Sequence, residues 1–133
     1  MKKVYIAGKL WDENDRKKLE LIDELCKSLG LKTFLPHRDA GVYKEGFDSK
    51  KFFEKDRDMV DWCDFMVAIL DWKGIGSGTA WEIGYAHAKK IPVIALVEDI
   101  KSLGKFDRVC VMCLNSVKLV ENLDDLSKEI KKL

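Results

Sequence analysis

A continuous apolar run at residues 65–70, Phe-Met-Val-Ala-Ile-Leu, constrains the fold of this chain more than any other feature. Such a run is typical of a β-strand that is buried on both faces, and strands of that kind occur in parallel sheets with helices on both sides. Residues 91–97 have the same character, and shorter β-prone segments occupy residues 4–7, 33–35 and 117–120. The sequence therefore predicts a parallel sheet of about five strands.

Helical patterns alternate with these strands. Leu19, Ile22, Leu25 and Leu29 recur at helical spacing, and Gly30 is a typical stop signal. Further helices are predicted after a cap at Asp48 or Ser49, over residues 79–89 and 106–114, and from Asn122 to Lys132. The alternation indicates an α/β fold, a flavodoxin-like doubly wound five-stranded parallel sheet with helices on both faces. In such folds ligands bind beyond the carboxyl ends of the strands, here in the loops after Ala7, Leu35, Leu70 and Val97.

Length and charge restrict the kind of partner. The 133 residues suffice for one domain, residues 1–133, that needs neither disulfides nor a structural metal. With 24 basic and 23 acidic residues the net charge is +1, too little for the positive field that binding to nucleic acid requires. A small molecule is the expected partner. The apolar stretch after Lys3 is too short for a signal peptide or a membrane span, so we expect a cytoplasmic protein without membrane contact.

Four cysteines are present, at positions 26, 63, 110 and 113. Two thiols spaced as Cys110-x-x-Cys113 can be redox-active or can bind zinc. A zinc site normally needs four ligands, and only His37 and His87 could add to this pair. We therefore expect no metal site and a packing role for the cysteines.

The segment 74–82, Gly-Ile-Gly-Ser-Gly-Thr-Ala-Trp-Glu, carries the strongest functional signal. It links the central strand to a predicted helix, and backbone N–H groups at a helix start bind anions or sugar hydroxyls. Gly76, Ser77 and Gly78 are therefore candidate binding residues. The alternative is a tight turn that merely favours glycine.

Two acidic residues are candidates for catalysis. Glu82 lies near the predicted helix start, where the helix dipole favours an ionised carboxylate suited to nucleophilic attack. However, Thr79-x-x-Glu82 also matches a capping box, in which the glutamate only bonds the backbone. Asp56 falls on the apolar stripe of its helix and so needs a partner or a ligand, unless it leans toward solvent or a lysine. The stripe itself consists of Phe52, Phe53, Met59, Val60 and Cys63.

Other side chains are weaker candidates. Tyr5 stands on the first strand, where it either orients a carboxylate or fills the core. His37, Arg38 and Asp39 lie in a predicted loop over residues 37–47, which is long enough to serve as a lid. Trp72 and Trp81 could stack on a base, although tryptophan is more often a core or interface residue.

Taken together, these motifs resemble the nucleoside 2-deoxyribosyltransferase family. The resemblance spans residue 3 to about residue 100, and its most specific part is the run Ser-Gly-Thr-Ala-Trp-Glu-Ile-Gly-Tyr-Ala at residues 77–86. It also includes Tyr-Ile-Ala-Gly at 5–8, Leu-Pro-His-Arg-Asp at 35–39, and Asp56 eight residues before Asp64. The joint occurrence of these motifs leaves little room for chance.

The resemblance implies a retaining double displacement without a cofactor. Glu82 would attack the anomeric carbon and expel the base, leaving a deoxyribosyl ester that a second base then attacks. Tyr5 would orient Glu82, and Asp56 would hold the sugar or help to protonate the leaving base. Gly8 follows the first strand and belongs to the implied substrate site.

This chain departs from the family pattern at several positions. Gly76 replaces an aspartate that many members use to contact the base, and Lys9 replaces a proline and could receive a phosphate together with Ser77. Related hydrolases cleave deoxynucleoside 5′-monophosphates without that aspartate, so a nucleotide N-glycosidase is the alternative enzyme. A nucleotide-binding protein without catalysis is a third possibility.

The family shares sites between subunits through Asn-x-Met. Met112 is the remaining counterpart here, and we expect a homo-oligomer, a dimer or larger.

Overall fold

The structure, a computed structural model, describes residues 1–71, 74–97 and 110–133. Its strands are β1 (Lys3–Ala7), β2 (Lys32–Phe34), β3 (Phe65–Ile69), β4 (Val93–Leu96) and β5 (Lys118–Val120). Its helices are α1 (Glu13–Ser28), α2 (Pro36–Asp39), α3 (Ser49–Trp62), α4 (Ser77–Ala88), α5 (Val111–Asn115) and α6 (Leu123–Lys131).

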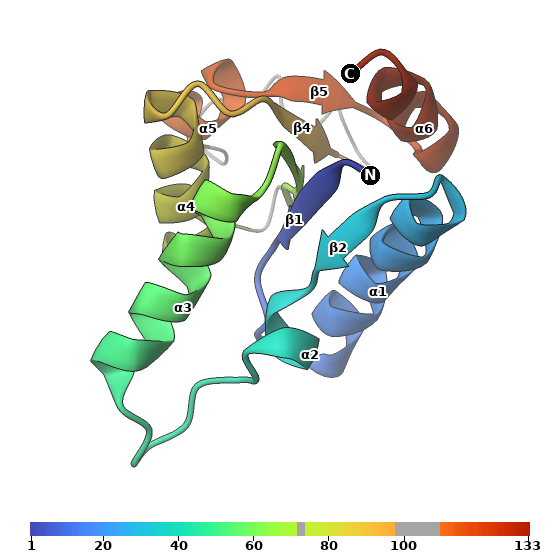
Figure 1. Cartoon of the computed structure of the whole chain (residues 1–133). Helices are drawn as coiled ribbons and strands as arrows, with labels where there is room; N and C mark the ends of the chain where they lie inside the picture. Colours follow the sequence, from blue (N-terminus) through green and yellow to red (C-terminus); the bar gives the residue numbers. More distant parts are fainter. Residues whose placement is uncertain (72–73, 98–109) are drawn as a thin grey trace.

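The strands form one parallel sheet in the order β2-β1-β3-β4-β5 (Figure 1). Val4 pairs with Phe65 and Ala7 with Ala68, so β1 and β3 end at the same edge of the sheet. The chain moves from β1 outward to β2 and then returns past β1 to β3, which is the reversal that defines a doubly wound sheet. The predicted fold class is confirmed.

Helices cover both faces of this sheet. Figure 1 shows α1 and α6 on one side and α3, α4 and α5 on the other. Side chains alternate along each strand, so Val4 and Ile6 of β1 pack with the first group, whereas Tyr5 and Ala7 pack with α3 and α4. Because of this alternation Tyr5 faces the helices that carry Asp56 and Glu82.

Short polar side chains start three of the helices. Asp12 accepts a hydrogen bond from the backbone N–H of Asp15 at the start of α1. Asp48 caps α3, and Asn122 caps α6, as the sequence predicts. Each such cap satisfies N–H groups that have no partner within the helix, and its loss costs about 1 kcal/mol.

Two predictions need correction, and a third is tested only in part. The predicted loop over residues 37–47 begins with the short helix α2, because Pro36 stands at its first position with a φ suited to a helix. Helix α4 starts at Ser77 rather than at Thr79. Of the helix predicted over residues 106–114, residues 106–109 lie outside the described part, and the described remainder is helical from Val111, with Cys110 as the N-cap residue.

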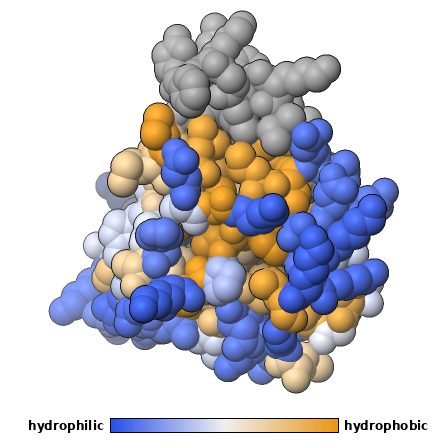
Figure 2. Space-filling view, turned by 90° about the horizontal axis from the view of Figure 1, so that it is seen from above, coloured by the Kyte–Doolittle hydropathy of each residue, from blue (hydrophilic) through white to orange (hydrophobic). Residues whose placement is uncertain are grey.

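Polar and apolar side chains are unevenly spread on the face seen from above in Figure 2. Hydrophobic residues gather in its centre, and hydrophilic residues border them on the right and at the lower left. In the described ranges, no helix is both long and apolar enough to cross a bilayer.

Candidate active site

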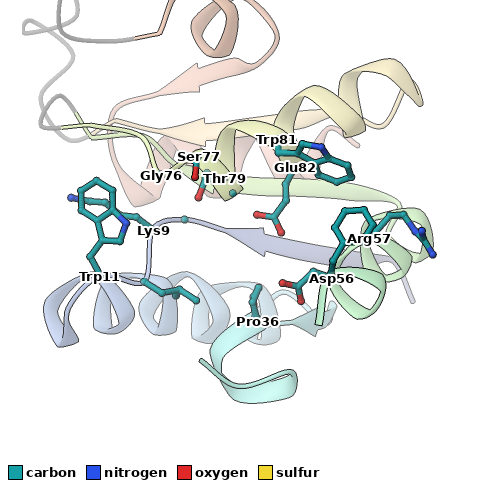
Figure 3. Close-up of a pocket in the computed structure, with 14 residues that line it drawn as sticks. Lys9, Trp11, Pro36, Asp56, Arg57, Gly76, Ser77, Thr79, Trp81 and Glu82 are labelled. Carbon is teal, nitrogen blue, oxygen red and sulfur yellow. The ribbon is translucent and has the colours of Figure 1, made fainter. Parts of the chain in front are cut away.

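A cavity of about 400 Å³ lies where β1 ends and α4 begins. This place is the switch point of the sheet, where chain connections from β1 and β3 diverge to opposite sides. Its volume lies in the range that suits small molecules. The lining residues are Gly8, Lys9, Leu10, Trp11, Pro36, Phe53, Asp56, Arg57, Gly76, Ser77, Gly78, Thr79, Trp81 and Glu82 (Figure 3).

Tyr5 lies beneath this cavity and contacts Glu82. The tyrosine side chain is fully buried, and its ring stacks on Phe34 with a centroid distance of 5.3 Å. Its hydroxyl donates a hydrogen bond to Oε2 of Glu82. Burial, with the nearby carboxylates, raises the pKa of Tyr5 well above its ordinary value, so the hydroxyl stays a donor throughout the working pH range. Tyr5 therefore fixes the position of the Glu82 carboxyl group.

Glu82 does not cap its helix. Gly76 is the N-cap residue of α4, no side chain caps it, and Thr79 is buried within the first turn. The capping interpretation is therefore wrong, because the helix starts two residues earlier than the sequence suggested. Glu82 falls in the second turn, where the helix dipole has weakened.

The sequence predicts an ionised Glu82 carboxylate, but the structure favours the protonated form. Burial raises the pKa of Glu82 to about 8, the Tyr5 hydrogen bond lowers it, and the nearby Asp56 raises it again. Desolvation of the charged form thus outweighs the stabilisation by the donated hydrogen bond. A free enzyme at neutral pH holds a proton on this carboxyl group for most of the time.

Asp56 projects from α3 into the same space. Figure 3 shows its carboxyl group and that of Glu82 directed toward the same part of the cavity. The Oδ1 atom of Asp56 is buried and has no hydrogen-bond partner within the described ranges. Burial raises the pKa of Asp56 to about 6, against a smaller lowering by Lys55. An acid that lacks a partner inside a cavity is available to a ligand.

The glycine-containing turn forms another wall of the cavity. Gly76, Ser77 and Gly78 line it at the first turn of α4, where backbone N–H groups have no acceptor within the helix. Gly8 lines it from the end of β1. A Cβ atom at Gly8 would lie 2.6 Å from Cδ2 of Leu19, so glycine there also lets α1 pack closely against the strand end.

Lys9 lies at the cavity but does not offer a free charge. Its ammonium group lies 3.6 Å from Oδ1 of Asp15 and 3.3 Å from Oδ2 of Asp71, and 4.6 Å from the centroid of the Trp11 ring. The positive charge of Lys9 is compensated by these two carboxylates. The expectation that Lys9 receives a phosphate is therefore not supported by its surroundings.

Aromatic side chains form a wall that the sequence signals hardly indicate. Trp81 and Phe53 line the cavity with ring centroids 5.3 Å apart, and each exposes almost half of its surface, 46% and 45%. Tyr85 stacks on the ring of Trp81, and Arg57 lies over the ring of Phe53. Only Trp81 was a candidate from the sequence; Phe53 could have been found because it lies one helical turn before Asp56.

Several candidates lie elsewhere. Met112 is 79% exposed on α5 and does not line the cavity. His37 and Arg38 pair with Glu20 and Asp23 of α1, so they fasten α2 to α1. Trp72 lies outside the described residues.

The cysteines fit the packing expectation with one exception. Cys26, Cys63 and Cys113 are buried, but Cys110 is exposed. The expectation that the Cys110-x-x-Cys113 pair packs in the interior is therefore wrong for Cys110, which stands at the start of α5 rather than inside it. Within the described part of the chain, no three His, Cys, Asp or Glu side chains are placed to hold a metal ion together.

Comparison with known proteins gives this geometry a context. The sequence profile of nucleoside 2-deoxyribosyltransferases matches residues 4–124, which include Tyr5, Asp56 and Glu82. The chain belongs to the nucleoside 2-deoxyribosyltransferase family. The resemblance inferred from the sequence motifs is thereby confirmed. No curated protein matches the chain significantly.

Solved structures agree with the fold of this family. A conserved protein from Enterococcus faecalis V583 is 28% identical, with 99% of this chain and 98% of that chain covered and a TM-score of 0.80. A 2-deoxyribosyltransferase from Bacillus psychrosaccharolyticus is 21% identical, with coverages of 94% and 90% and a TM-score of 0.77. A CMP N-glycosidase from Clostridium botulinum is 18% identical, with coverages of 99% and 100% and a TM-score of 0.61. The latter two similarities concern the fold alone.

Proposed function

We propose that this protein breaks the N-glycosidic bond of a 2′-deoxynucleoside by double displacement, with Glu82 as the nucleophile, and transfers the sugar to a second base. The observation that carries the proposal is the convergence of two acids in one cavity. Glu82, held by Tyr5, and Asp56, with its unpartnered oxygen, come from different helices and face the same space. Membership of the family supports this assignment.

In the first step, the single proton that the two acids share moves from Glu82 to Asp56, and an oxygen of the resulting Glu82 carboxylate attacks the anomeric carbon. The bond from that carbon to the base nitrogen breaks, its electron pair leaves with the base, and a proton from Asp56 neutralises the departing nitrogen. The Tyr5 hydrogen bond stabilises the ionised form of Glu82. The positive charge that develops on the sugar also favours the ionised form of Glu82, because the sugar and the carboxylate lie close together in a cavity of low polarity.

In the second step, Asp56 takes a proton from the incoming base, whose nitrogen attacks the anomeric carbon. The ester bond to Glu82 breaks, and its electron pair returns to the carboxylate. Glu82 therefore carries the sugar as an ester, and Asp56 donates a proton in the first step and accepts one in the second. Both groups end in their starting state, so no cofactor enters the reaction.

The walls of the cavity suit the two halves of a nucleoside. Trp81 and Phe53 present aromatic surface of the kind on which a planar base stacks. The N–H groups at the first turn of α4, together with the Ser77 hydroxyl, suit sugar hydroxyls. We propose an unphosphorylated substrate, because the charge of Lys9 is already compensated by Asp15 and Asp71.

Product analysis tests the reaction. The protein is incubated with a deoxynucleoside, with and without a free acceptor base, and the products are separated by chromatography. We expect a new deoxynucleoside only when the acceptor is present. Free deoxyribose at an equal rate in both mixtures would instead identify a hydrolase, and an unchanged substrate would refute the proposed activity.

The role of Glu82 is tested by trapping the ester. Wild-type protein is quenched in acid after mixing with substrate, digested, and analysed by mass spectrometry. We expect one deoxyribosyl unit on the peptide that contains Glu82, and neither adduct nor turnover in Glu82→Gln. Glu45→Gln is the matched control, since Glu45 is an exposed residue outside the cavity. Turnover by Glu82→Gln within a few fold of wild type would contradict the assignment.

We also propose that the protein forms a homo-oligomer in which Met112 reaches a partner's cavity. The support is the resemblance to the family, together with the exposure of two adjacent apolar side chains on α5, Val111 at 51% and Met112 at 79%. Sedimentation of wild type and Met112→Glu tests the idea. A wild-type monomer at micromolar concentration would refute it.

A further inference from the structure

The start of α5 carries a pair of cysteines that the proposed reaction does not use. Cys110 is the N-cap residue of this helix and is exposed, whereas Cys113 is one turn further on and only 4% exposed. Neither residue lines the cavity that contains Glu82. The pair therefore combines an accessible thiol with a protected one.

The backbone holds the two thiols next to each other. The N–H of Leu114 donates to the carbonyl oxygen of Cys110 at 3.0 Å, which closes a helical turn over residues 110–114. Residues three apart on such a turn lie on one face with Cβ atoms about 5–6 Å apart. The two side chains therefore start from the same face of one helical turn. A disulfide needs Cβ atoms about 3.5–4.5 Å apart, so it requires only a small local adjustment.

The surroundings favour different protonation states on the two sulfurs. The backbone N–H of Cys113, the Cys113 thiol and the N–H of Met112 all lower the pKa of the Cys110 thiol below its ordinary value. Burial raises the pKa of Cys113 to about 11. It also raises the pKa of Cys63 to about 11 and that of Cys26 to about 12. Cys110 is therefore the thiol of this chain that most readily becomes the reactive thiolate.

We infer that Cys110 and Cys113 form a thiol–disulfide exchange site, outside the cavity of their own subunit, that reacts with small disulfides such as glutathione disulfide. The Cys110 thiolate attacks one sulfur of glutathione disulfide and releases one glutathione thiolate. Cys113, after losing its proton, attacks the Cys110 sulfur of the mixed disulfide and releases the second glutathione. The protein loses two electrons and two protons, and one glutathione disulfide becomes two glutathione molecules.

The inference is tested on the full chain by mass spectrometry. Reduced protein is freed of reductant under argon, incubated with glutathione buffers of increasing oxidised fraction, quenched in acid, and digested without reduction. In wild type we expect a loss of two hydrogen atoms located to the peptide that contains both Cys110 and Cys113. In Cys113→Ser we expect a glutathione adduct that stays on Cys110, because the second step is blocked.

Two controls separate this site from general thiol reactivity. Cys26→Ser removes a buried thiol from α1 and should form the Cys110–Cys113 disulfide as wild type does. In reduced wild type, brief treatment with iodoacetamide at pH 7 should label Cys110 before the other three cysteines. This second measurement needs no variant and so does not depend on how any substitution affects folding.

Three outcomes would overturn the inference. They are a stable glutathione adduct on wild-type Cys110 without the internal disulfide, an unmodified pair in fully oxidised glutathione, and labelling of Cys110 no faster than that of Cys26 or Cys63. Each would show that the two thiols do not act together. The reaction of the deoxynucleoside is measured separately, so failure of one proposal leaves the other standing.

Discussion

A change of pH should switch the proposed reaction on and off in two steps, because Glu82 and Asp56 share one cavity. Their pKa values, about 8 and about 6, are treated as those of the pair, since the charge of Asp56 raises the pKa of Glu82. The reaction needs one proton on the pair: an ionised Glu82 to attack and a protonated Asp56 to assist the leaving base. Acid adds a second proton and stops the attack, whereas alkali removes the last proton and stops the assistance.

The size of the effect follows from these two values. With macroscopic pKa values of 6 and 8, about 0.8 of the enzyme carries a single proton at pH 7, and about 0.09 does so at pH 5 or pH 9. The value of kcat/KM should therefore peak near pH 7 and fall about ninefold toward either limit. The single proton can sit on Glu82 or on Asp56, and only the form with the proton on Asp56 is active. The ratio of these two forms does not depend on pH, so the active fraction follows the singly protonated fraction at every pH.

The assay measures initial rates at low substrate concentration in overlapping buffers of constant ionic strength. Enzyme held at pH 5 or pH 9 and returned to pH 7 controls for unfolding. Asp56→Asn should lose the alkaline limb, keep a single acid limb below pH 8, and be about a hundredfold slower, as expected when a positioned acid-base group is removed. A wild-type profile that is flat between pH 5 and pH 9, or two limbs that persist in Asp56→Asn, would refute the reasoning.

Three further predictions address stability and specificity. Glu82→Gln should unfold at a higher temperature than wild type at pH 8, because burial raises the pKa of Glu82 from about 4.5 to about 8, so that wild type loses stability as pH rises through this range. The free energy of unfolding of the variant should exceed that of wild type by about 1–3 kcal/mol at pH 8, and the difference should vanish near pH 4. A lower melting temperature of the variant at pH 8 would contradict the burial argument. Gly8→Ala should lower the free energy of unfolding by about 1–3 kcal/mol, since the new methyl group meets Leu19, and equal stability in thermal melts would show that Leu19 yields freely. The ratio of kcat/KM for a deoxynucleoside to that for its 5′-monophosphate should exceed one in wild type, because Lys9 is already paired; faster turnover of the monophosphate would restore the phosphate role of Lys9.

The sheet could be predicted because its signals are local. Residues 65–70 are apolar without a break, and burial on both faces is the one arrangement in which such a strand is stable. The sequence places the start of α4 two residues too late, because Ser77 and Gly78 have low helix propensity, although the first turn of a helix can hold such residues. Local propensity alone does not determine where the helix begins.

The candidate site could be predicted only in part. The acids stood out because Asp56 interrupts an apolar stripe and Glu82 follows a glycine-rich turn. The contact between Tyr5 and Glu82 spans 77 positions in the sequence, so no local pattern encodes it. The pairing of Lys9 with Asp15 and Asp71 likewise depends on three separate segments. The sequence therefore indicates which polar and charged side chains are present, but not which of them form hydrogen bonds or ion pairs with one another.

The unequal space around the glycines determines how this cavity can change its specificity during evolution. At position 8 a Cβ atom would lie 2.6 Å from Cδ2 of Leu19, so any side chain there requires the buried Leu19 to shift. At Gly78 a Cβ atom would meet nothing within 4 Å, and at Gly76 its nearest neighbour would be Cβ of Lys9 at 3.4 Å. Substitutions on the α4 wall, at positions 76 and 78, should therefore be tolerated better than substitutions at position 8, at the end of β1. A library that varies positions 76 and 78 should yield folded proteins with altered acceptor choice, whereas one that varies position 8 should mostly yield unstable ones.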